Sequence, residues 1–560
     1  MSNYWTEGRG RKLARRRLLG WGAASAGVGA LSLAGIACGD SSSNSTSTPG
    51  GAGSTPGASP SAGTPKQGGK VTFAYSNVPQ NLDVQRIVSP TLGSAACLVM
   101  NRLLRDDPHA DPNEYKIQNE IAESYQQPDD LTYVFKLRQD VKWQDADPYN
   151  GRGLVADDII KAYQRMGAKD PSAIWAYLVS WIDSMEASDD YTLTIKAKEP
   201  NARALGYLAF YQSPIVPIEC VDKFGDLQKP ESWVGTGAYK LTAWQPGVGF
   251  QFDKNPNYWE NGFPYLDHVD LNEVTDLSSQ LSAFIGGNLD VMDSIDPTVV
   301  KTVQQQASGA KLVSNKGVGG WSYAWNVKSG SPFADPRVRK AFDLSIDRES
   351  MMSSIAGDGN ADLRTGPLNQ GFVEWARSDA DIKKDVVFDL KQAKELLTQA
   401  GHETLATKLL GNNATEQAWI TWALNQGKKS GITINPDVVE RTVYLTAQTQ
   451  HKWNYGQVYS IRAYPDPDDY LYPLFVTGQS KNYGDVSDPT LDELITKQRQ
   501  EFDHEKRKAI LQEIDARWNK DFNYHTFSYT SKRVDGVSKR FSNYVPRPYD
   551  YTGVRYAWVS

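Results

Sequence analysis

Helix patterns and strand patterns alternate along most of this chain, and that alternation constrains the fold more than any other feature. Apolar residues at every second position predict strands in "GGKVTFAYSN", "DYTLTIKAKEP" and "VGTGAYKLTAW". The segment "ADDIIKAYQRM" predicts an amphipathic helix with Ile159, Ile160 and Tyr163 on one side. Because both kinds of element are interspersed, we expect an α/β fold, and 560 residues are enough for two or three domains.

Three more helices are indicated by the residues at their ends. Asp335 and Pro336 suit the N-cap and the first position of a helix in "FADPRVRKAFDLSIDRESMM". Asp389 and Gly401 suit the N-cap and the C-cap of a helix in "FDLKQAKELLTQAG". The segment "SDPTLDELITKQRQEF" repeats the Asp–Pro start at residues 488–489. These segments therefore predict three helices in the second half of the chain.

The first 37 residues have the pattern of an export signal. The basic residues Arg9, Arg11, Lys12, Arg15, Arg16 and Arg17 precede an uncharged run, rich in Gly, Ala and Leu, that extends from residue 18 to residue 37. A positive segment followed by an apolar one is typical of a secretion signal that is removed. The segment "RRRLL" also resembles a twin-arginine signal, so twin-arginine export and general secretion both stay open. A retained membrane anchor is the alternative, although Gly and Ala make the run weakly apolar.

Cys38 ends the apolar run and begins a polar segment, residues 38–67, in which Gly, Ser, Thr and Pro dominate. Such a composition cannot form a core, so we expect a flexible tether. An apolar signal, one Cys and a polar tether together resemble a bacterial lipoprotein leader, in which the Cys is diacylated. Gly35 departs from that pattern, since a Leu is more usual there. We expect a lipid anchor at Cys38 and a location on the outer face of the cytoplasmic membrane.

The charge balance argues against nucleic acid as a partner. Loss of residues 1–37 removes six basic residues and one acidic residue, which leaves 54 Lys and Arg against 65 Asp and Glu. No basic stripe remains to follow a phosphate backbone. Cys97 and Cys220 are the other two cysteines, and they can either pair outside the cytoplasm or remain as buried thiols.

No motif in the sequence indicates an enzyme. "NQGKKSG" lacks the first Gly of a phosphate loop, "VGTGAYK" lacks the third Gly of a dinucleotide fingerprint, and no Gly-x-Ser-x-Gly elbow occurs. The six histidines are scattered, and "HETLA" lacks the second His of a zinc helix, so we expect no metal and no cofactor. Paired carboxylates such as Asp157 and Asp158 leave a secreted glycoside-type hydrolase open as an alternative.

Four blocks of sequence occur in one order along the chain. They are "IAESYQQPDDLTYVFKLRQDVKWQD" with "LVADDIIKAYQRM", then "GTGAYKLTAWQPGVGFQFDKNPNYWENGFPYLDHV", then "FADPRVRKAFDLSIDRESM", and then "FDLKQAKELLTQAG". Each block alone is a weak pattern. In this order, from about Gly68 to the C-terminus, they resemble the family 5 extracellular solute-binding proteins, which are the peptide, nickel and oligosaccharide receptors of ABC importers.

The resemblance implies a two-lobed periplasmic-binding-protein-like type II fold with an additional inserted domain. Lobe I would comprise residues 68–107, 230–318 and 530–560, the inserted domain residues 108–229, and lobe II residues 319–529. Such lobes close over a solute at a hinge, and we expect the glycine-containing segments "KGVGGWSYAWNV" and "VGTGAYK" near the crossings between them.

The resemblance also implies a monomeric receptor that does no chemistry and delivers its solute to a membrane permease and an ATPase. Peptide is the expected solute, because the whole-chain match is to peptide receptors. An oligosaccharide is the main alternative. An envelope sensor that hands its ligand to a membrane kinase is a further one.

The stretch "SIRAYPDPDDYLYPLF" resembles the family block in which an Asp binds the ammonium group of a peptide, but Ala463 stands at that position. Arg462 beside it could meet a carboxylate or a sugar hydroxyl. Trp321, Tyr323 and Trp325 would share one face of a strand, so they would all meet the ligand or all lie in the core. The expected ligand-binding residues are Asn77, Trp321, Tyr323, Trp325, Arg462, Tyr464 and Asp466.

Overall fold

The computed structural model describes residues 64–560, except for residues 77–78, 88, 112, 170–171, 297–298, 318, 413, 462–465, 480 and 549. They belong to the unit Ser61–Ser560, which is described by itself. The expected export signal and Cys38 lie outside the described residues. None of the helices within them combines the length and the apolar character needed to cross a bilayer.

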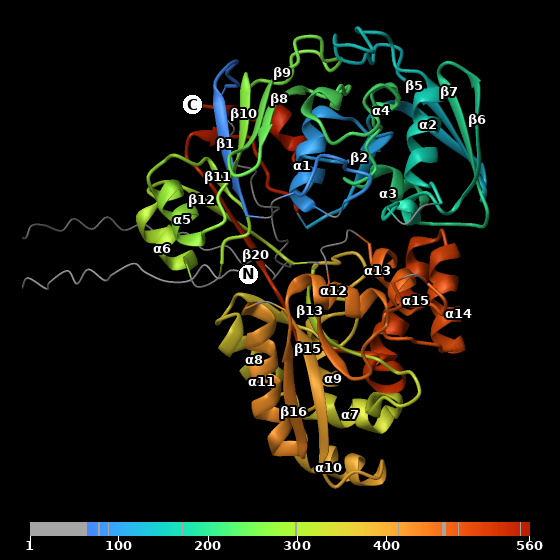
Figure 1. The fold of residues 1–560 in the computed structure, drawn as a ribbon, viewed down its shortest axis with the longest axis vertical. Helices are drawn as coiled ribbons and strands as arrows, with labels where there is room; N and C mark the ends of the chain where they lie inside the picture. Colours follow the sequence, from blue (N-terminus) through green and yellow to red (C-terminus); the bar gives the residue numbers. More distant parts are fainter. Residues whose placement is uncertain are drawn as a thin grey trace, which may run out of the picture. The chain divides into compact units, whose positions relative to one another are not determined.

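A seven-stranded sheet is assembled from parts of the chain that are far apart in sequence (Figure 1). Its order is β12-β20-β11-β1-β10-β9-β8. The strands are β1 (Lys70–Tyr75), β8 (Tyr239–Gln245), β9 (Gly249–Lys254), β10 (His268–Glu273), β11 (Val291–Met292), β12 (Lys311–Asn315) and β20 (Arg533–Val537). Strand β1 runs parallel to both of its neighbours, β10 and β11. A central parallel strand is covered on both faces, so Val71 and Phe73 enter one core and Ala74 enters the core on the opposite face.

A four-stranded antiparallel sheet follows, with the order β4-β5-β7-β6. Its strands are β4 (Ala122–Asp129), β5 (Thr132–Leu137), β6 (Ile182–Asp189) and β7 (Thr192–Ala197). Helix α2 (Ala156–Met166) packs on this sheet through Ile159, Ile160 and Tyr163, which are buried as predicted. One continuous hydrophobic core joins this sheet to the seven-stranded sheet. The boundary between lobe I and the inserted domain therefore stays a prediction.

A five-stranded sheet with the order β16-β15-β17-β13-β18 lies in the remaining part of the chain. Its strands are β13 (Gly320–Trp325), β15 (Leu405–Gly411), β16 (Ile432–Val438), β17 (Gly456–Ile461) and β18 (His525–Phe527). The helices around it are α7 (Pro336–Leu344), α8 (Arg348–Ile355), α9 (Asp379–Asp385), α10 (Leu390–Gln399), α11 (Ala414–Ser430), α12 (Arg441–Thr449), α13 (Asp468–Phe475), α14 (Pro489–Gln500) and α15 (His504–Arg517).

The helix ends in this region follow the sequence closely. The side chains of Asp335, Asp389 and Asp488 each accept a hydrogen bond from a backbone N–H in the first turn of the next helix. Gly401 follows the end of α10 with φ +88°, a conformation that glycine adopts without strain. The three predicted helix starts and their N-caps are confirmed. The segment that begins at Asp335 contains two helices, because α7 ends at Leu344 and Asp347 caps α8, and the C-cap of α10 is Ala400, one residue before Gly401.

The remaining elements are shorter or lie at the edges. The helices are α1 (Pro90–Val99), α3 (Ala204–Ala209), α4 (Ile218–Phe224), α5 (Leu277–Ile285) and α6 (Val300–Gln306). The strands are β2 (Leu104–Asp106), β3 (Ile117–Asn119), β14 (Ala361–Leu363), β19 (Tyr529–Ser531), β21 (Phe541–Ser542) and β22 (Trp558–Val559). Single helical turns occur at Ala176–Leu178, Pro230–Ser232, Pro332–Ala334, Trp518–Phe522 and Thr552–Tyr556.

The chain passes from the seven-stranded sheet to the five-stranded sheet between β12 and β13. It returns between β18 and β20, by way of β19, which pairs with β14 in a separate two-stranded sheet. We call residues 64–316 and 533–560 the larger half, and residues 319–531 the smaller half. Residues 316, 317 and 319 of the segment "KGVGG" lie in the first connection, near the expected crossing. The expectation for "VGTGAYK" is wrong. Its glycines lie against the backbone of Val99, where a Cβ at Gly235 would lie 1.9 Å from the Val99 carbonyl oxygen.

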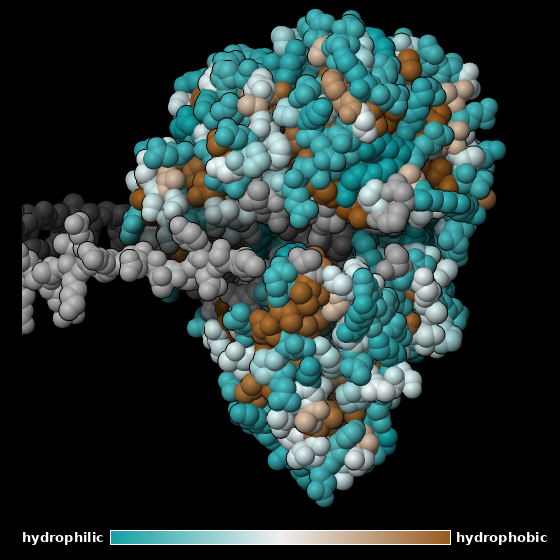
Figure 2. Space-filling model, viewed as in Figure 1, coloured by the Kyte–Doolittle hydropathy of each residue, from teal (hydrophilic) through white to brown (hydrophobic). Residues whose placement is uncertain are grey.

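The face drawn in Figure 2 is largely hydrophilic. Apolar colour gathers over the smaller half near α12, whose Val443 and Leu445 are 54% and 39% exposed. Single exposed apolar residues are ordinary on a folded protein. The buried apolar side chains form four cores, two in each half.

Candidate functional site

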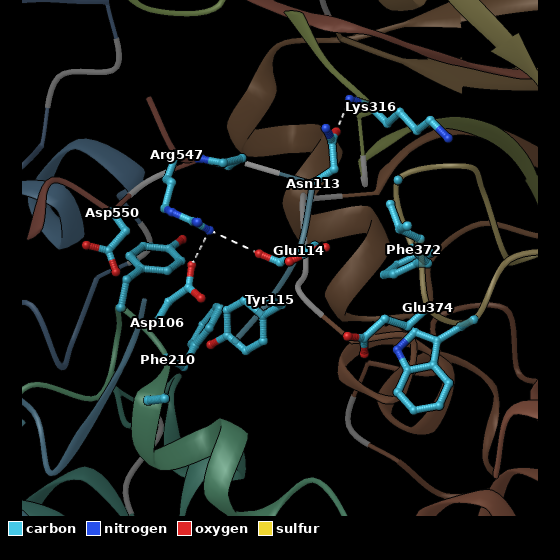
Figure 3. A pocket seen from close by; sticks show the side chains of 16 residues that line it. Asp106, Asn113, Glu114, Tyr115, Phe210, Lys316, Phe372, Glu374, Arg547 and Asp550 are labelled. Carbon is cyan, nitrogen blue, oxygen red and sulfur yellow. Dashed lines mark hydrogen bonds and ion pairs between the residues drawn. The ribbon is translucent and has the colours of Figure 1, made fainter. Parts of the chain in front are cut away.

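A pocket lined by both halves is the candidate solute site (Figure 3). Its cavity volume is about 90 Å³, and the pocket is open to solvent. The larger half contributes Asp106, Asn113, Glu114, Tyr115, Ala209, Phe210, Tyr211, Lys316, Arg547, Pro548 and Asp550, and the smaller half contributes Gly371, Phe372, Val373, Glu374 and Trp375. Sites for small molecules are concave and combine apolar surface with a few polar groups. This pocket has such a mixed lining.

Aromatic rings line the pocket from both halves. Phe210 and Tyr211 follow α3 in the larger half, with their ring centroids 4.6 Å apart in an edge-to-face arrangement. Phe372 and Trp375 lie in the loop between β14 and α9 of the smaller half. The centroid of the Trp375 ring lies 4.6 Å from that of the His504 ring. Rings packed against other rings present fixed apolar surfaces. A solute between these walls would contact both halves at once.

Two carboxylates of the pocket are already bound by arginines of the larger half. Arg547 donates to Asp106 at 2.7 Å and to the carbonyl oxygen of Glu114 at 3.2 Å (Figure 3). It also donates to the carbonyl oxygen of Ala110 at 2.7 Å. Burial raises the pKa of Asp106 to about 7, although the Arg547 guanidinium lowers it. Asp550 is buried too, which raises its pKa, but an ion pair with Arg102 at 2.9 Å outweighs this and lowers the pKa below the usual value. These pairs fix the pocket wall.

Two other carboxylates of the pocket are open to solvent. The Glu114 side chain is 40% exposed and pairs with Lys116 at 2.5 Å, and Lys116 is itself 58% exposed. The Glu374 side chain is 42% exposed and lies 3.8 Å from Nε2 of His504. Lys316, at the connection between the halves, donates its backbone N–H to Asn113 at 2.7 Å and lines the same pocket. Charges of both signs are therefore within reach of a solute.

Asp466, an expected ligand residue, lies outside this pocket. Its carboxylate accepts hydrogen bonds of 2.9 and 2.7 Å from Arg507 and one of 2.9 Å from the N–H of Asp468. Burial raises the pKa of Asp466, but the positive charges of Arg507 and Arg203 lower it by more. The pKa is therefore below its usual value. Because its oxygens are engaged by its own chain, Asp466 fixes the start of α13 in this conformation.

Tyr323 and Trp325 lie in the core of the smaller half. The Tyr323 hydroxyl donates to the carbonyl oxygen of Trp419 at 2.9 Å, and the Trp325 ring stacks on Phe333 at 4.1 Å. Trp321 is partly buried against the same core. The strand therefore brings the three aromatic residues together on the core side, away from the pocket lining.

The other expected ligand residues, Asn77, Arg462 and Tyr464, lie outside the described residues, as does Ala463. Their contact with a solute stays a prediction. Among the residues that the structure does describe, no group of three or more His, Cys, Asp or Glu side chains could hold a metal ion. Cys97 and Cys220 are both buried free thiols.

Comparison with known proteins gives one consistent family. The family model for bacterial extracellular solute-binding proteins, family 5 Middle, matches residues 116–482. The periplasmic oligopeptide-binding protein OppA of Haemophilus influenzae is 23% identical over 516 residues, which cover 84% of this chain and 91% of that protein.

Solved structures agree with this assignment at the level of the fold. DppA of Helicobacter pylori, an ABC transporter-associated periplasmic binding protein in complex with the peptide STSA, has a TM-score of 0.76 and 20% identity, covering 88% of this chain and 98% of that chain. AgaA of A. tumefaciens R10, in complex with agropinic acid, has a TM-score of 0.75 and 21% identity, covering 88% and 99%. The chain folds as a two-lobed periplasmic binding protein, and it belongs to the bacterial extracellular solute-binding proteins of family 5.

Proposed function

We propose that this protein is the extracellular receptor of an ABC importer, that it captures peptides between its two halves, and that it delivers them to a membrane permease. The observation that carries the proposal is the pocket lined jointly by both halves. A solute held there would bridge the halves and exclude water from its own contacts. The family includes receptors rather than enzymes, which supports a role in binding without catalysis.

A peptide is the solute class that the comparisons favour. The name of the Haemophilus influenzae relative states oligopeptide binding, and the Helicobacter pylori structure holds a tetrapeptide. The pocket is compatible with this, since aromatic walls suit apolar side chains, and Glu374 and Lys316 suit charged groups. An oligosaccharide stacked on the same rings is the second candidate.

Calorimetry against two mixtures tests the solute class. The mature protein is titrated with a mixed library of peptides and, separately, with a mixed library of glycans. We expect micromolar binding from the peptides and none from the glycans. Heat from the glycans alone would refute the peptide assignment. If a hydrolytic activity toward either mixture copurified with the protein through chromatography, the proposed role as a receptor without catalysis would be refuted.

Position 463 offers a sharper test of how a peptide would be held. We propose that an ammonium group sits near Ala463 without a charged partner, which is costly for a buried charge. Ala463→Asp should then tighten peptide binding, measured by calorimetry with the same library. Unchanged or weaker binding would show that the ammonium group does not lie there.

The proposal extends to the anchoring of the receptor. We propose that Cys38 is diacylated after removal of residues 1–37, so that a monomer is tethered to the outer face of the cytoplasmic membrane beside its permease and ATPase. Mass spectrometry of the mature N-terminus should show a lipid-modified cysteine. A soluble species that begins at another residue would contradict the anchor.

A further inference from the structure

A buried ion pair joins the two halves at a place separate from the chain crossings. Arg203 directly precedes α3 in the larger half, and Asp469 lies in the first turn of α13 in the smaller half. The guanidinium donates through Nε and Nη2 to the two carboxylate oxygens, each at 2.9 Å. Both side chains are only 3% exposed. A charged pair this deep between two parts of a protein forms only when those parts are in contact.

Two further hydrogen bonds cross between the halves beside this pair. The Tyr207 hydroxyl of α3 donates to Asp468 at 2.9 Å. The backbone N–H of Ala202 donates to the carbonyl oxygen of Arg499 at 2.8 Å. A third bond runs the other way, from Gln500 of the smaller half to Glu199 of the larger half at 3.3 Å, so the contact is a small polar interface. We call the Arg203–Asp469 pair, with the bonds from Tyr207 and Ala202, the ionic clasp.

The smaller half holds in place two carboxylates beside Asp469, those of Asp468 and Asp466. Asp468 also accepts hydrogen bonds from Gln498 at 2.6 Å and from Arg499 at 3.1 Å, which belong to the same half. Asp466 is fixed by Arg507, also of the smaller half. Asp466 and Asp468 are therefore held by the smaller half itself, whereas the carboxylate of Asp469 receives its hydrogen bonds from Arg203 of the larger half.

The larger half is likewise shaped to present the guanidinium of Arg203. This group lies over the rings of Tyr115 and Tyr207, 5.4 and 5.5 Å from their centroids. A Cβ at residue 206 would lie 1.3 Å from Nη1 of Arg203, so only a glycine at Gly206 leaves room for this conformation. The larger half thus holds the Arg203 guanidinium ready for Asp469.

The clasp borders the candidate solute pocket. Tyr115, which lies under Arg203, lines the pocket, and so do the residues that follow α3. Lys316, at the connection between the halves, lines the pocket as well. The pocket therefore extends from the chain crossings to the clasp, and a movement of the halves about the crossings would separate Arg203 from Asp469.

We propose that Arg203 and Asp469 are positioning residues that set how tightly this receptor holds its solute, because the closed conformation requires their pairing. This inference rests on the proposed function, since it assumes that solute is captured by closure. In the closed state each charge compensates the desolvation of the other, so loss of one partner leaves a buried charge without compensation. The closed population then falls, and the apparent affinity falls with it.

The test compares four forms of the mature protein: wild type, Arg203→Gln, the double variant Arg203→Met with Asp469→Leu, and the control Arg165→Gln. Arg165 makes a similar two-pronged pair with Asp83, with contacts of 2.5 and 3.1 Å, inside the larger half. A pool of random tri- to pentapeptides is the probe, and calorimetry gives the apparent affinity. Small-angle scattering without any peptide measures compaction.

We expect Arg203→Gln to bind the peptide pool about tenfold more weakly or worse, and to have a larger radius of gyration without peptide. The double variant should recover most of the affinity, because it removes both buried charges together. Arg165→Gln should lose thermal stability with little change in affinity or compaction. Circular dichroism confirms that each variant is folded.

The clasp is refuted if folded Arg203→Gln matches wild type in both affinity and scattering. It is also refuted if the double variant is as weak as the single one, or if Arg165→Gln weakens binding equally. Should the pool bind none of the four proteins, the proposed peptide function fails, and the peptide-free scattering of Arg203→Gln against wild type still decides for or against the clasp.

Discussion

A Cβ atom at Gly317 would lie 2.2 Å from the carbonyl oxygen of Ser531, so the two connections between the halves touch through their backbones. A side chain fits there only if one connection moves. We expect Gly317→Ala to lower the free energy of unfolding by about 1–3 kcal/mol, the usual effect of overpacking. Urea denaturation measures this loss. Gly153→Ala is the control, since its Cβ would meet only the Tyr191 hydroxyl, at 3.9 Å. Equal losses in the two variants would contradict the close contact.

The two tryptophans of β13 should behave differently. Trp325 is 1% exposed and packs on Phe333, whereas Trp321 is only partly buried. We expect Trp325→Ala to cost about 3–5 kcal/mol of unfolding free energy, because it leaves a cavity in the core. Trp321→Ala should cost less than half of that. Guanidinium denaturation gives both values. A larger loss for Trp321→Ala than for Trp325→Ala would contradict the deeper burial of Trp325.

His525 should stay neutral in the folded protein over the physiological range. Burial, with a smaller effect of the nearby Arg364 guanidinium, lowers its pKa to about 3. The unfolded chain takes up a proton as the pH falls through about 6.5, while the folded protein does not. This group therefore adds stability above pH 6.5 that is lost between pH 6.5 and pH 3, by about 1.4 kcal/mol per pH unit.

The measurement compares wild type with His525→Gln in urea at pH 7, 6, 5 and 4. The difference in unfolding free energy between the two proteins should shift steadily in favour of the variant as the pH falls. NMR of the imidazole provides an independent check. A His525 resonance that titrates near pH 6.5 in the folded protein would contradict the low pKa.

The two thiols of the larger half should resist alkylation. Burial raises the pKa of Cys220 to about 11 and also raises the pKa of Cys97, and both are free in the structure. The thiolate is the reactive form, so a raised pKa and burial both slow the reaction. Iodoacetamide at pH 8 should modify neither residue in native protein and both in guanidinium. A mass change on reduction alone would show instead that the two cysteines are paired.

The sequence predicts the local structure well where one residue type has one physical use. An Asp followed by Pro marked the starts of α7 and α14, because a carboxylate accepts the free N–H groups of a first turn and Pro lacks one. The apolar spacing of Ile159, Ile160 and Tyr163 marked the buried face of α2. These signals are contained within a few residues of the chain.

The candidate site was less accessible to such reasoning. One role of Asp466 is local, since its carboxylate accepts a hydrogen bond from the N–H of Asp468, two residues later. A role of this kind can be predicted from sequence. Its main partner, Arg507, is 41 residues away, and the partner of Asp469 is 266 residues away. Only the folded chain brings such pairs together.

The pocket aromatics were missed for a related reason. Phe210 ends a short helix, while Tyr115, Phe372 and Trp375 lie in loops, where no periodic pattern singles out a ring. A concentration of aromatic residues in segments such as "NQGFVEWARSD" was the one available signal. It does not distinguish a pocket wall from a core.

Strand β20, residues 533–537, is the partner of both β11 and β12 in the seven-stranded sheet. A ribosome makes β1 first and β20 only after the whole smaller half has been made. Until then β12 has no neighbour in its own sheet, because β20 is the strand with which it pairs. All strands of the smaller half, including β18, are therefore made before β20. The larger half, which contains β1, therefore completes its sheet last. The two halves of the receptor cannot both be complete until β20 has been made.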